Sequence, residues 1–392
     1  MNKVTDIQLY HDSFVSLHVQ LHNQLRQLIL SGHWPKDTRL PSENELTSHL
    51  KISRSTIRLA LQQIEIEGLI ERIPGKGTFV SYQPSLENRN LLIAFVTCDF
   101  NDAKAIDLLN GAEHEIRSSP YSIIFKNVEN HYEEMEVLTR LQEENVAGAL
   151  LWPNVGNIRT QQEDTQNYQS LQLPIVYLDR IIEGVEYDLV TSDNYAGAYG
   201  LMEHLIELGH EHIIFLSHKQ MDILPVKERY RAYKDVMSKH NLIPASPWLI
   251  GEESKEPTGN NTLHSSVDSN SPESQQIKDC LLNAPQRPTA IFAINDFIAI
   301  LAMRVMKYLG IKVPDEISIA GFDDIDLSAH LDVPLTTVAQ DSFTIGKHAA
   351  RLLLDRLEGH CGSINHITIP TQLRVRSSTA IVSKISNLGG GD

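Results

Sequence analysis

Cysteines and long apolar runs are both scarce in this sequence, and each shortage excludes a class of protein. The chain has only three cysteines, Cys98, Cys280 and Cys361, which are odd in number and far apart. They form no CxxC motif and no disulfide framework, which fits a reducing cytoplasm and a packing role. The longest apolar runs, residues 91–96 and 147–152, are far short of the ~20 residues that a membrane span needs. We therefore expect a cytoplasmic protein with no membrane partner.

Signals for secretion and for catalysis are missing as well. The N-terminal segment shows no basic-then-apolar pattern, so no secretory signal is visible. No Gly-x-Ser-x-Gly, His-Glu-x-x-His or Gly-x-Gly-x-x-Gly motif accompanies the apolar segments. His204, His210 and His212 lack the i, i+4 spacing of a zinc-binding helix. We therefore expect that the protein is not an enzyme and that it has no cofactor and no metal site.

The charge, by contrast, is substantial and is divided unevenly along the 392 residues. The whole chain carries a net charge of −16, but residues 1–81 hold nine Lys and Arg against eight Asp and Glu, a net +1, so the remainder carries −17. An acidic body repels DNA, whereas a nearly neutral head with clustered arginines can bind phosphates. This division, in a chain long enough for several domains, predicts two functions in one protein.

Helical periodicity and capping signals mark three helices within residues 14–81. Apolar residues recur at helical spacing from position 17 to position 29. Ser42 and Glu45 form a capping box that starts a second, short helix, and Ser53 starts a third.

A predicted hairpin follows the third helix. Two alternating segments, 69–73 and 78–81, flank a Pro-Gly-Lys-Gly turn. Three helices and a hairpin in this order predict a winged helix-turn-helix. The start of its third helix is rich in hydroxyl and guanidinium groups, which bind phosphates and base edges. We therefore predict that this domain binds DNA through its third helix.

The same domain resembles the GntR family of regulators. The matching stretches, in the family's order and spacing, are LHVQLHNQLRQLILSGHW, RLPSENEL, ISRSTIRLAL and EGLIERIPGKGTFV. The resemblance implies DNA contacts at the starts of the second and third helices and at the hairpin turn. Carried over by position, these contacts are Glu43, Ser53, Arg54, Ser55, Thr56, Arg58, Gly75, Lys76 and Gly77.

Three residues depart from the GntR pattern. Asn44 stands where many members have Arg, which predicts one weaker phosphate contact. Lys51 stands at the usual Gly of the turn between the second and third helices, where a positive φ would cost a non-glycine residue ~1 kcal/mol. Pro74 replaces a polar residue of the hairpin turn, which argues against minor-groove reading by the wing.

A second, larger domain follows a linker. Residues 82–90 are polar and lack periodicity, and from 91 to 385 short apolar segments alternate with helical ones. We expect strands near 91–96, 122–125, 147–151, 175–178, 189–191, 212–216, 290–294, 317–321 and 336–338, and helices that include 196–208, 227–239, 296–309 and 343–357. Repeated β-α units predict parallel sheets covered by helices, and nearly 300 residues exceed one average sheet. The expected fold class is therefore α/β: a winged helix-turn-helix domain, then a two-lobed domain with a ligand-binding cleft.

This second domain resembles the effector-binding domains of the LacI/GalR type, which are similar to periplasmic sugar-binding proteins. The matching pieces, in family order, are LPIVYLDR, TSDNYAGAYGLMEHLIELGHEHIIFL, ERYRAYKDVM, AIFAINDFIAILAMRVMKYLGIKVPDEISIAGFDD, LTTVAQ and TQLRVRSST. The resemblance implies that the chain crosses between the lobes three times. By position, lobe one takes about 91–191 and 340–369, and lobe two takes about 192–339 and 370–385.

The LacI/GalR resemblance also implies a set of ligand-binding residues, which transfer one by one to Asp179, Arg229, Asn295, Asp323 and Gln340. Aspartate carboxylates accept hydrogen bonds from adjacent hydroxyls, and an arginine donates a fork to ring or hydroxyl oxygens. The set therefore favours a sugar.

Two segments depart from the LacI/GalR pattern. Residues 97–104 lack the usual aromatic pair that packs against a ligand ring, and Asp99 and Lys104 are the candidates to replace it. Residues 251–274 are polar and rich in Ser, Asn and Glu, which predicts a surface loop or a disordered insertion.

Head and body together resemble regulators of the arabinose-repressor type. We expect a homodimer that binds a near-palindromic operator through two heads, and a small effector, a sugar such as the pentose arabinose, that shifts its DNA affinity. We expect the protein to repress transcription and the ligand to release it from the operator. Three alternatives stay open: the same architecture sensing a purine or nucleoside, an activator, and an α/β sugar-processing enzyme. A transport binding protein would need a secretory signal and would have no DNA-binding head.

Overall fold

The computed structural model describes most of the chain, which divides into two compact units. The described residues are 7, 9, 16–30, 34–82, 90–98, 103–154, 162–182, 184, 185, 187–251, 271–360 and 363–382. One unit takes in residues up to Asn90 together with Asp355–Ser363, and the other takes in Leu91–Leu354 and the chain from Ile364 onward. Outside the described residues lie positions 83–89 of the predicted linker, Asp99, Cys361 and positions 252–270 of the predicted loop. We call the elements up to residue 82 the head and those from residue 90 onward the body.

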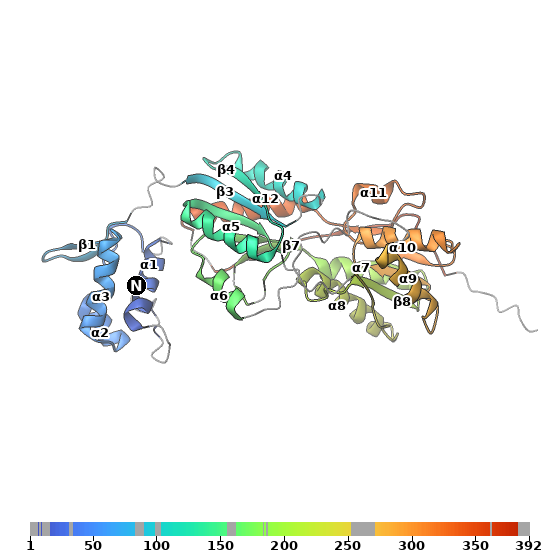
Figure 1. Ribbon diagram of the computed structural model, residues 1–392, viewed down its shortest axis with the longest axis horizontal. Helices are drawn as coiled ribbons and strands as arrows, with labels where there is room; N and C mark the ends of the chain where they lie inside the picture. Colours follow the sequence, from blue (N-terminus) through green and yellow to red (C-terminus); the bar gives the residue numbers. More distant parts are fainter. Residues whose placement is uncertain are drawn as a thin grey trace, which may run out of the picture. The chain divides into compact units, whose positions relative to one another are not determined.

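The head consists of three helices and a hairpin, which confirms the predicted winged helix-turn-helix (Figure 1). Helices α1 (Leu17–Leu30), α2 (Glu43–Leu50) and α3 (Arg54–Ile66) precede the antiparallel strands β1 (Ile70–Ile73) and β2 (Gly77–Val80). The predicted capping box forms, because Ser42 Oγ accepts from the backbone N–H of Glu45 and Glu45 Oε2 accepts from the backbone N–H of Ser42. The apolar faces of the helices meet in one core, which includes Leu21, Leu25, Ile29, Leu46, Ile57, Ala60, Leu61 and Ile64.

A short segment before α2 extends the hairpin, a feature that the sequence did not predict. The backbone N–H of Asp37 donates to Val80 O, and that of Leu40 donates to Thr78 O, each at 2.9 Å. The backbone N–H of Val80 donates in return to Thr38 O. The segment therefore acts as a third strand beside β2, and it joins the hairpin firmly to the helical core.

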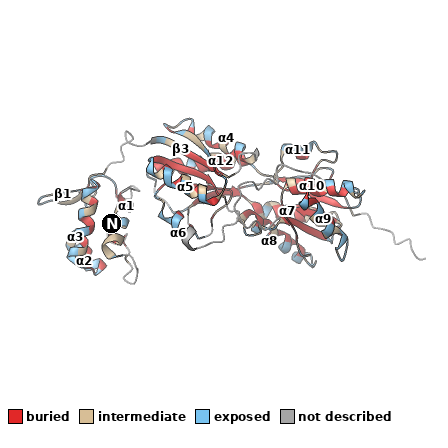
Figure 2. Ribbon diagram, in the orientation of Figure 1, coloured by how far each residue is buried: buried red, intermediate tan, exposed pale blue. Residues whose placement is uncertain are grey.

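Lobe one of the body is built on a six-stranded sheet with the order β13-β7-β6-β5-β3-β4. The pairs β13–β7, β7–β6, β6–β5 and β3–β4 are parallel. The strands are β3 (Asn90–Thr97), β4 (Ser122–Asn127), β5 (Val146–Trp152), β6 (Ile175–Leu178), β7 (Asp188–Ser192) and β13 (His366–Ile369). The helices of this lobe are α4 (Ala103–Ile116), α5 (His131–Glu143), α6 (Gln162–Ser170) and α12 (Ser342–Leu357). All seven residues of β5 are buried, and Figure 2 shows burial concentrated in the strands.

Lobe two is built on a parallel four-stranded sheet with the order β11-β10-β8-β9. Its strands are β8 (Ile213–His218), β9 (Trp248–Ile250), β10 (Ala290–Ala293) and β11 (Ser318–Ala320), and a separate antiparallel pair joins β12 (Thr337–Ala339) to β14 (Gln372–Arg374). Its helices are α7 (Asn194–Glu207), α8 (Leu224–Lys239), α9 (Pro272–Leu282), α10 (Asp296–Tyr308) and α11 (Asp326–Ala329). The sequence missed the short strands β9, β13 and β14.

The chain passes between the lobes three times, after β7, after β12 and after β13 (Figure 1). Each lobe has its own apolar core, one built on β3, β5 and β6 and the other on β8, β10 and β11. The predicted two-lobed α/β architecture is thereby confirmed. Because ligands bind beyond the carboxyl ends of parallel strands, the residues after β5, β6 and β8 stand where a ligand would bind.

Candidate functional sites

The start of α3 presents a cluster of hydroxyl and guanidinium groups to solvent. Ser53 Oγ caps the helix by accepting from the backbone N–H of Thr56, and it lies 2.7 Å from the hydroxyls of both Ser55 and Thr56. Arg54, Ser55 and Arg58 are exposed on the same first turns. The helix N-terminus and these side chains can together bind phosphates and base edges.

Glu43 organises the arginines of this surface. Its Oε2 accepts a hydrogen bond from Arg58 Nε at 2.9 Å, and its Oε1 lies 3.9 Å from a terminal nitrogen of Arg72. Arg72 also pairs with Glu65, at 3.0 Å. A carboxylate repels phosphate, so Glu43 is suited to orient Arg58 and not to contact the DNA backbone itself.

The turn between α2 and α3 contains the strained backbone that the sequence predicted. Lys51 ends α2 with φ 55° and ψ 35°, in the left-handed region. Its backbone N–H donates to Thr47 O, so the conformation serves as a helix cap. Only glycine adopts this region without a steric cost, which makes the turn an identifiable local weakness.

The three predicted wing residues lie at the hairpin: Gly75 and Lys76 in the turn between β1 and β2, and Gly77 at the start of β2. Both glycines have positive φ, 76° and 123°, and Lys76 is exposed between them. A Cβ on Gly77 would lie 3.0 Å from Arg39 Nε. The guanidinium of Arg39 therefore packs against the wing, and sequence reasoning missed it because Arg39 precedes the hairpin by more than thirty residues.

In lobe one, Asp179 anchors the candidate effector site. It follows β6 with φ 66°, and its side chain is almost fully buried. Lys104 Nζ, from the first turn of α4, donates to Asp179 Oδ1 at 2.7 Å, and Arg180 Nε lies 3.8 Å from Oδ2. Burial alone would raise the pKa of Asp179, but Lys104, Arg180 and Arg229 together outweigh it and hold that pKa below its ordinary value. The carboxylate is therefore ionised and can accept hydroxyl protons.

In lobe two, Arg229 of α8 is the central side chain. Its Nε donates to Asn194 Oδ1 at 3.0 Å, one terminal nitrogen donates to Ile294 O at 2.6 Å, and the other lies 3.7 Å from Asp323 Oδ1. The guanidinium carbon lies 3.6 Å from the centroid of the Phe322 ring. These contacts fix the orientation of Arg229. Burial of the guanidinium lowers the pKa of Arg229 from its ordinary value.

Gln340 joins the two halves of the site at the second crossover. Its Oε1 accepts from Lys104 Nζ at 3.1 Å and from Ser192 Oγ at 2.7 Å. Its Nε2 donates to Asp323 Oδ1. One network therefore connects Asp179 and Lys104 of lobe one with Asp323 and Arg229 of lobe two, which brings together four of the five predicted ligand residues.

Asn295, the fifth predicted ligand residue, has a local structural duty. Its side-chain oxygen caps α10 by accepting from the backbone N–H of Ile298 at 2.9 Å. It directly follows Ile294, whose carbonyl binds Arg229. The neighbouring Asp296 is buried, and its carboxylate accepts from Ser328, Thr337 and the backbone N–H of Ile325.

Several site residues were missed by sequence reasoning. Arg180 follows Asp179 directly, Trp152 ends β5, and His218 ends β8. Burial, followed by the charges of Arg180 and Arg229, lowers the pKa of His218 to about 4, so this side chain is neutral. All three lie at or just past the carboxyl end of a parallel strand. Because ligands bind at these ends, this position is the sequence signal that could have identified them.

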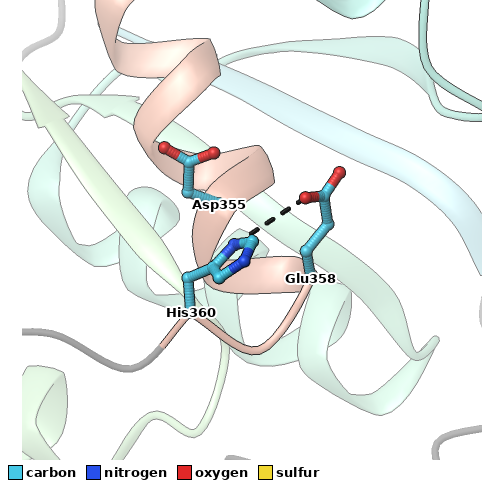
Figure 3. Close-up of side chains that lie close together, drawn as sticks. All are labelled: Asp355, Glu358 and His360. Carbon is cyan, nitrogen blue, oxygen red and sulfur yellow. Dashed lines mark ion pairs between the residues drawn. The ribbon is translucent and has the colours of Figure 1, made fainter.

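Two of the three histidines considered above as metal ligands, His204 and His210, make hydrogen bonds within lobe two. His204 Nε2 lies 3.1 Å from Thr379 Oγ1, and His210 lies 3.1 Å from both Thr289 Oγ1 and Ala380 O. A different cluster, Asp355, Glu358 and His360, lies around the end of α12 (Figure 3). Glu358 and His360 are exposed and 3.7 Å apart, an ordinary surface pair, so the cluster alone does not identify a metal site.

Comparisons with known proteins agree with both halves of the structure. Residues 17–80 match the family model of bacterial regulatory proteins of the gntR family, and residues 202–379 match that of the periplasmic binding protein-like domain. Among the described residues, no helix is long and apolar enough to cross a membrane.

The relatives span nearly the whole chain. An arabinose metabolism transcriptional repressor of Geobacillus stearothermophilus is 29% identical over 371 residues, which cover 92% of this chain and 97% of the relative. A protein of the same description from Halalkalibacterium halodurans is 25% identical, with 91% and 95% covered. A solved complex of the transcriptional regulator CelR with cellobiose aligns with a TM-score of 0.61 and 22% identity, covering 85% of this chain and 93% of the other. The last likeness concerns the fold alone.

Proposed function

We propose that this chain, which joins a gntR-family DNA-binding head to a periplasmic-binding-protein-like body, is a transcriptional repressor of carbohydrate-utilisation genes that a sugar releases from its operator. The named relatives are transcriptional regulators and not enzymes. The observation that carries the proposal is the Gln340 network, which connects a buried carboxylate and cations of lobe one with Asp323 and Arg229 of lobe two. Arabinose, named in the relatives' descriptions, makes a pentose the favoured effector.

The head would bind DNA as part of a homodimer in the cytoplasm. Two copies of α3 would enter successive major grooves of a near-palindromic operator. Arg54, Ser55 and Arg58 would contact bases and phosphates, and Ser53 and Thr56 would hold the helix start in shape. Gly75, Lys76 and Gly77 would place the wing, and Glu43 would aim Arg58.

The body would respond to a sugar through residues of both lobes. Asp179 and Asp323 would accept from sugar hydroxyls, while Arg229, Asn295 and Gln340 would donate to oxygens. Because Gln340 binds partners in both lobes, a ligand that competes for its partners changes the free energy of one lobe arrangement relative to the other. A difference of 1–3 kcal/mol, about 5–150-fold in affinity, is the usual size of such coupling.

The experiment is an operator-binding assay on the full chain, with the operator obtained by selection from random DNA and with sugars added. We expect Asp323→Ala and Arg229→Ala to keep operator affinity but to lose release by the sugar that releases the wild type. Lys307→Ala is the matched control, because Lys307 pairs with Asp332 on the exposed surface of lobe two. Normal release from both site variants would contradict the assignment of the effector site.

A further inference from the structure

Buried polar atoms without a partner are concentrated in and just after three strands of the body, and the residues after these strands include those of the candidate effector site. Among the described residues, five buried side-chain nitrogen and oxygen atoms have no hydrogen-bond partner: Trp152 Nε1, Tyr177 Oη, Arg180 Nε, Ser217 Oγ and His218 Nδ1. Four of them belong to β5, β6 or β8, and Arg180 lies two residues past the end of β6. A buried polar group without a partner is destabilising, so such groups are rare, and a cluster of them points to a ligand that completes their hydrogen bonds.

Two of these atoms can only donate. An indole nitrogen and a guanidinium nitrogen have no acceptor capacity, so a ligand that satisfies them must present oxygen acceptors. The two side chains are adjacent, because the guanidinium carbon of Arg180 lies 4.9 Å from the centroid of the Trp152 ring. Lys104 Nζ lies 5.9 Å from the same ring. Two cations and an N–H donor thus share one neighbourhood, which we call the cationic wall: Lys104, Trp152 and Arg180.

Among the cations of the site that the structure describes, Arg180 has the weakest ionic partner. Lys104, Arg180 and Arg229 face the carboxylates of Asp179 and Asp323, and the buried carboxyl group of Asp296 also acts on Arg229. Lys104 already takes one oxygen of Asp179, and the 3.8 Å from Arg180 to the other is too long for a hydrogen bond.

Among the described residues, the other titratable neighbours of Arg180 do not pair with it. Burial, together with the charges of Arg180 and Arg229, lowers the pKa of His218 to about 4, so His218 is neutral and adds no charge to the site. Glu134 also lies near Arg180, but Tyr168 and the backbone N–H of Asn154 already bind its carboxyl oxygens. Arg180 is therefore a mostly buried guanidinium whose ionic partner, Asp179, lies beyond hydrogen-bond distance.

We propose that the effector is an anionic sugar, whose carboxylate or phosphate binds the cationic wall while its hydroxyls bind Asp179, Asp323 and Arg229. This inference rests on the proposed function and narrows its effector class. A carboxylate or phosphate supplies several acceptor oxygens, which suits the donors of Trp152, Arg180 and Lys104 together. A neutral sugar would leave the charge of Arg180 as poorly compensated as it is without a ligand.

The test compares neutral sugars with their anionic derivatives by calorimetric titration of the full chain. The panel consists of L-arabinose, D-ribose, D-xylose, D-glucose and D-galactose, each with its aldonate and its terminal phosphate ester. We expect one anionic member to bind at least about tenfold more tightly than its neutral parent, as hydrogen bonds to a charged group imply. Comparing each aldonate with the corresponding phosphate ester shows which of the two anions binds the cationic wall.

Variants of Lys104 separate the charge from the fold. Lys104→Gln should weaken the preference for the anion, whereas Lys104→Arg should retain it. Arg180 remains beside Asp179 in both variants, and a cooperative thermal unfolding transition like that of the wild type shows that each variant folds. Lys307→Gln, which removes a surface lysine of lobe two, is the control and should bind like the wild type.

Each outcome decides between the two claims. If a neutral sugar binds as tightly as its anions and still releases the operator, the inference fails and the proposed function stands. An anionic preference that survives Lys104→Gln unchanged would also overturn the assignment to the wall. If no sugar of either kind binds, both the inference and the sugar effector fail.

Discussion

Gly111 of α4 and Gly346 of α12 lie in one helix crossing that has no space for a side chain. A Cβ on Gly111 would lie 1.9 Å from the carbonyl oxygen of Phe343, and a Cβ on Gly346 would lie 1.9 Å from that of Leu108. Helix α4 carries Lys104 in its first turn, and α12 begins two residues after Gln340. The crossing therefore fixes the spacing of two side chains that meet in the effector site.

Gly111→Ala should destabilise lobe one and weaken effector binding. The added methyl group meets backbone, which cannot rotate away, so we expect the upper end of the ~1–3 kcal/mol cost of overpacking or more. Chemical denaturation and sugar titration measure the two effects. Gly200→Ala in α7 is the control, because a Cβ there has no neighbour within 4 Å, and it should stabilise by about 0.5–1 kcal/mol. Equal stability of Gly111→Ala and the wild type would contradict this account of the crossing.

Arg54→Ala and Arg58→Ala should each weaken operator binding by about 1–3 kcal/mol, the usual size of a specific arginine contact. Both side chains are exposed at the start of α3, so little stability should be lost. Arg117→Ala removes the same charge from an exposed ion pair with Glu113, just past the end of α4, and should leave DNA affinity unchanged. Titrations over a range of salt concentrations measure the effect, and unchanged affinity in both head variants would refute the predicted interface.

Lys51→Gly should stabilise the head. Its φ of 55° is costly for lysine, and glycine should recover up to ~1 kcal/mol, less the entropy that glycine gains in the unfolded chain. Lys51→Ala is the control, because it removes the side chain but keeps the Cβ and the strain. Hydrogen exchange of the α3 amides reports the head alone. Faster exchange in Lys51→Gly than in Lys51→Ala would show that the conformation is not strained.

Local signals predicted the head well because its features depend on neighbours in sequence. The Ser42 capping box, the cap at Ser53 and the strained φ of Lys51 are each decided within a few residues. The packing of Arg39 against Gly77 depends on the pairing of residues 37–40 with β2, which are distant in sequence. No local periodicity predicts this third strand.

The body shows the same limit at its site. Family resemblance supplied Asp179, Arg229, Asp323 and Gln340, and the structure brings them into one network. It could not supply Trp152 or His218, which are matched by no motif and reach the site only because parallel strands end together. Lys104 was a candidate from the sequence, but its bonds to Asp179 and Gln340 join residues 75 and 236 positions away.

Glu134 should make the protein less stable as the pH rises towards neutrality. Its side chain is fully buried, and burial raises its pKa from the ordinary value of 4.5 to about 7, although Tyr168 and the backbone N–H of Asn154 donate to it. Between these two values the folded state holds a proton that the unfolded state releases. The stabilisation from neutral Glu134 is therefore complete below pH 4.5 and is lost as the pH rises to about 7.

The measurement is the free energy of unfolding across this pH range for the wild type and Glu134→Gln. Glutamine does not titrate, so the difference between the two proteins isolates this carboxyl group from oppositely acting groups such as His210, whose pKa burial lowers to about 4. We expect the difference to change by roughly 3 kcal/mol at 1.36 kcal/mol per pKa unit. Tyr168→Phe removes a hydrogen bond that lowers the pKa, so it should move the loss of stability to higher pH. A difference that does not vary with pH would mean that Glu134 is ionised in the folded protein throughout, with its charge carried by the Tyr168 and Asn154 hydrogen bonds.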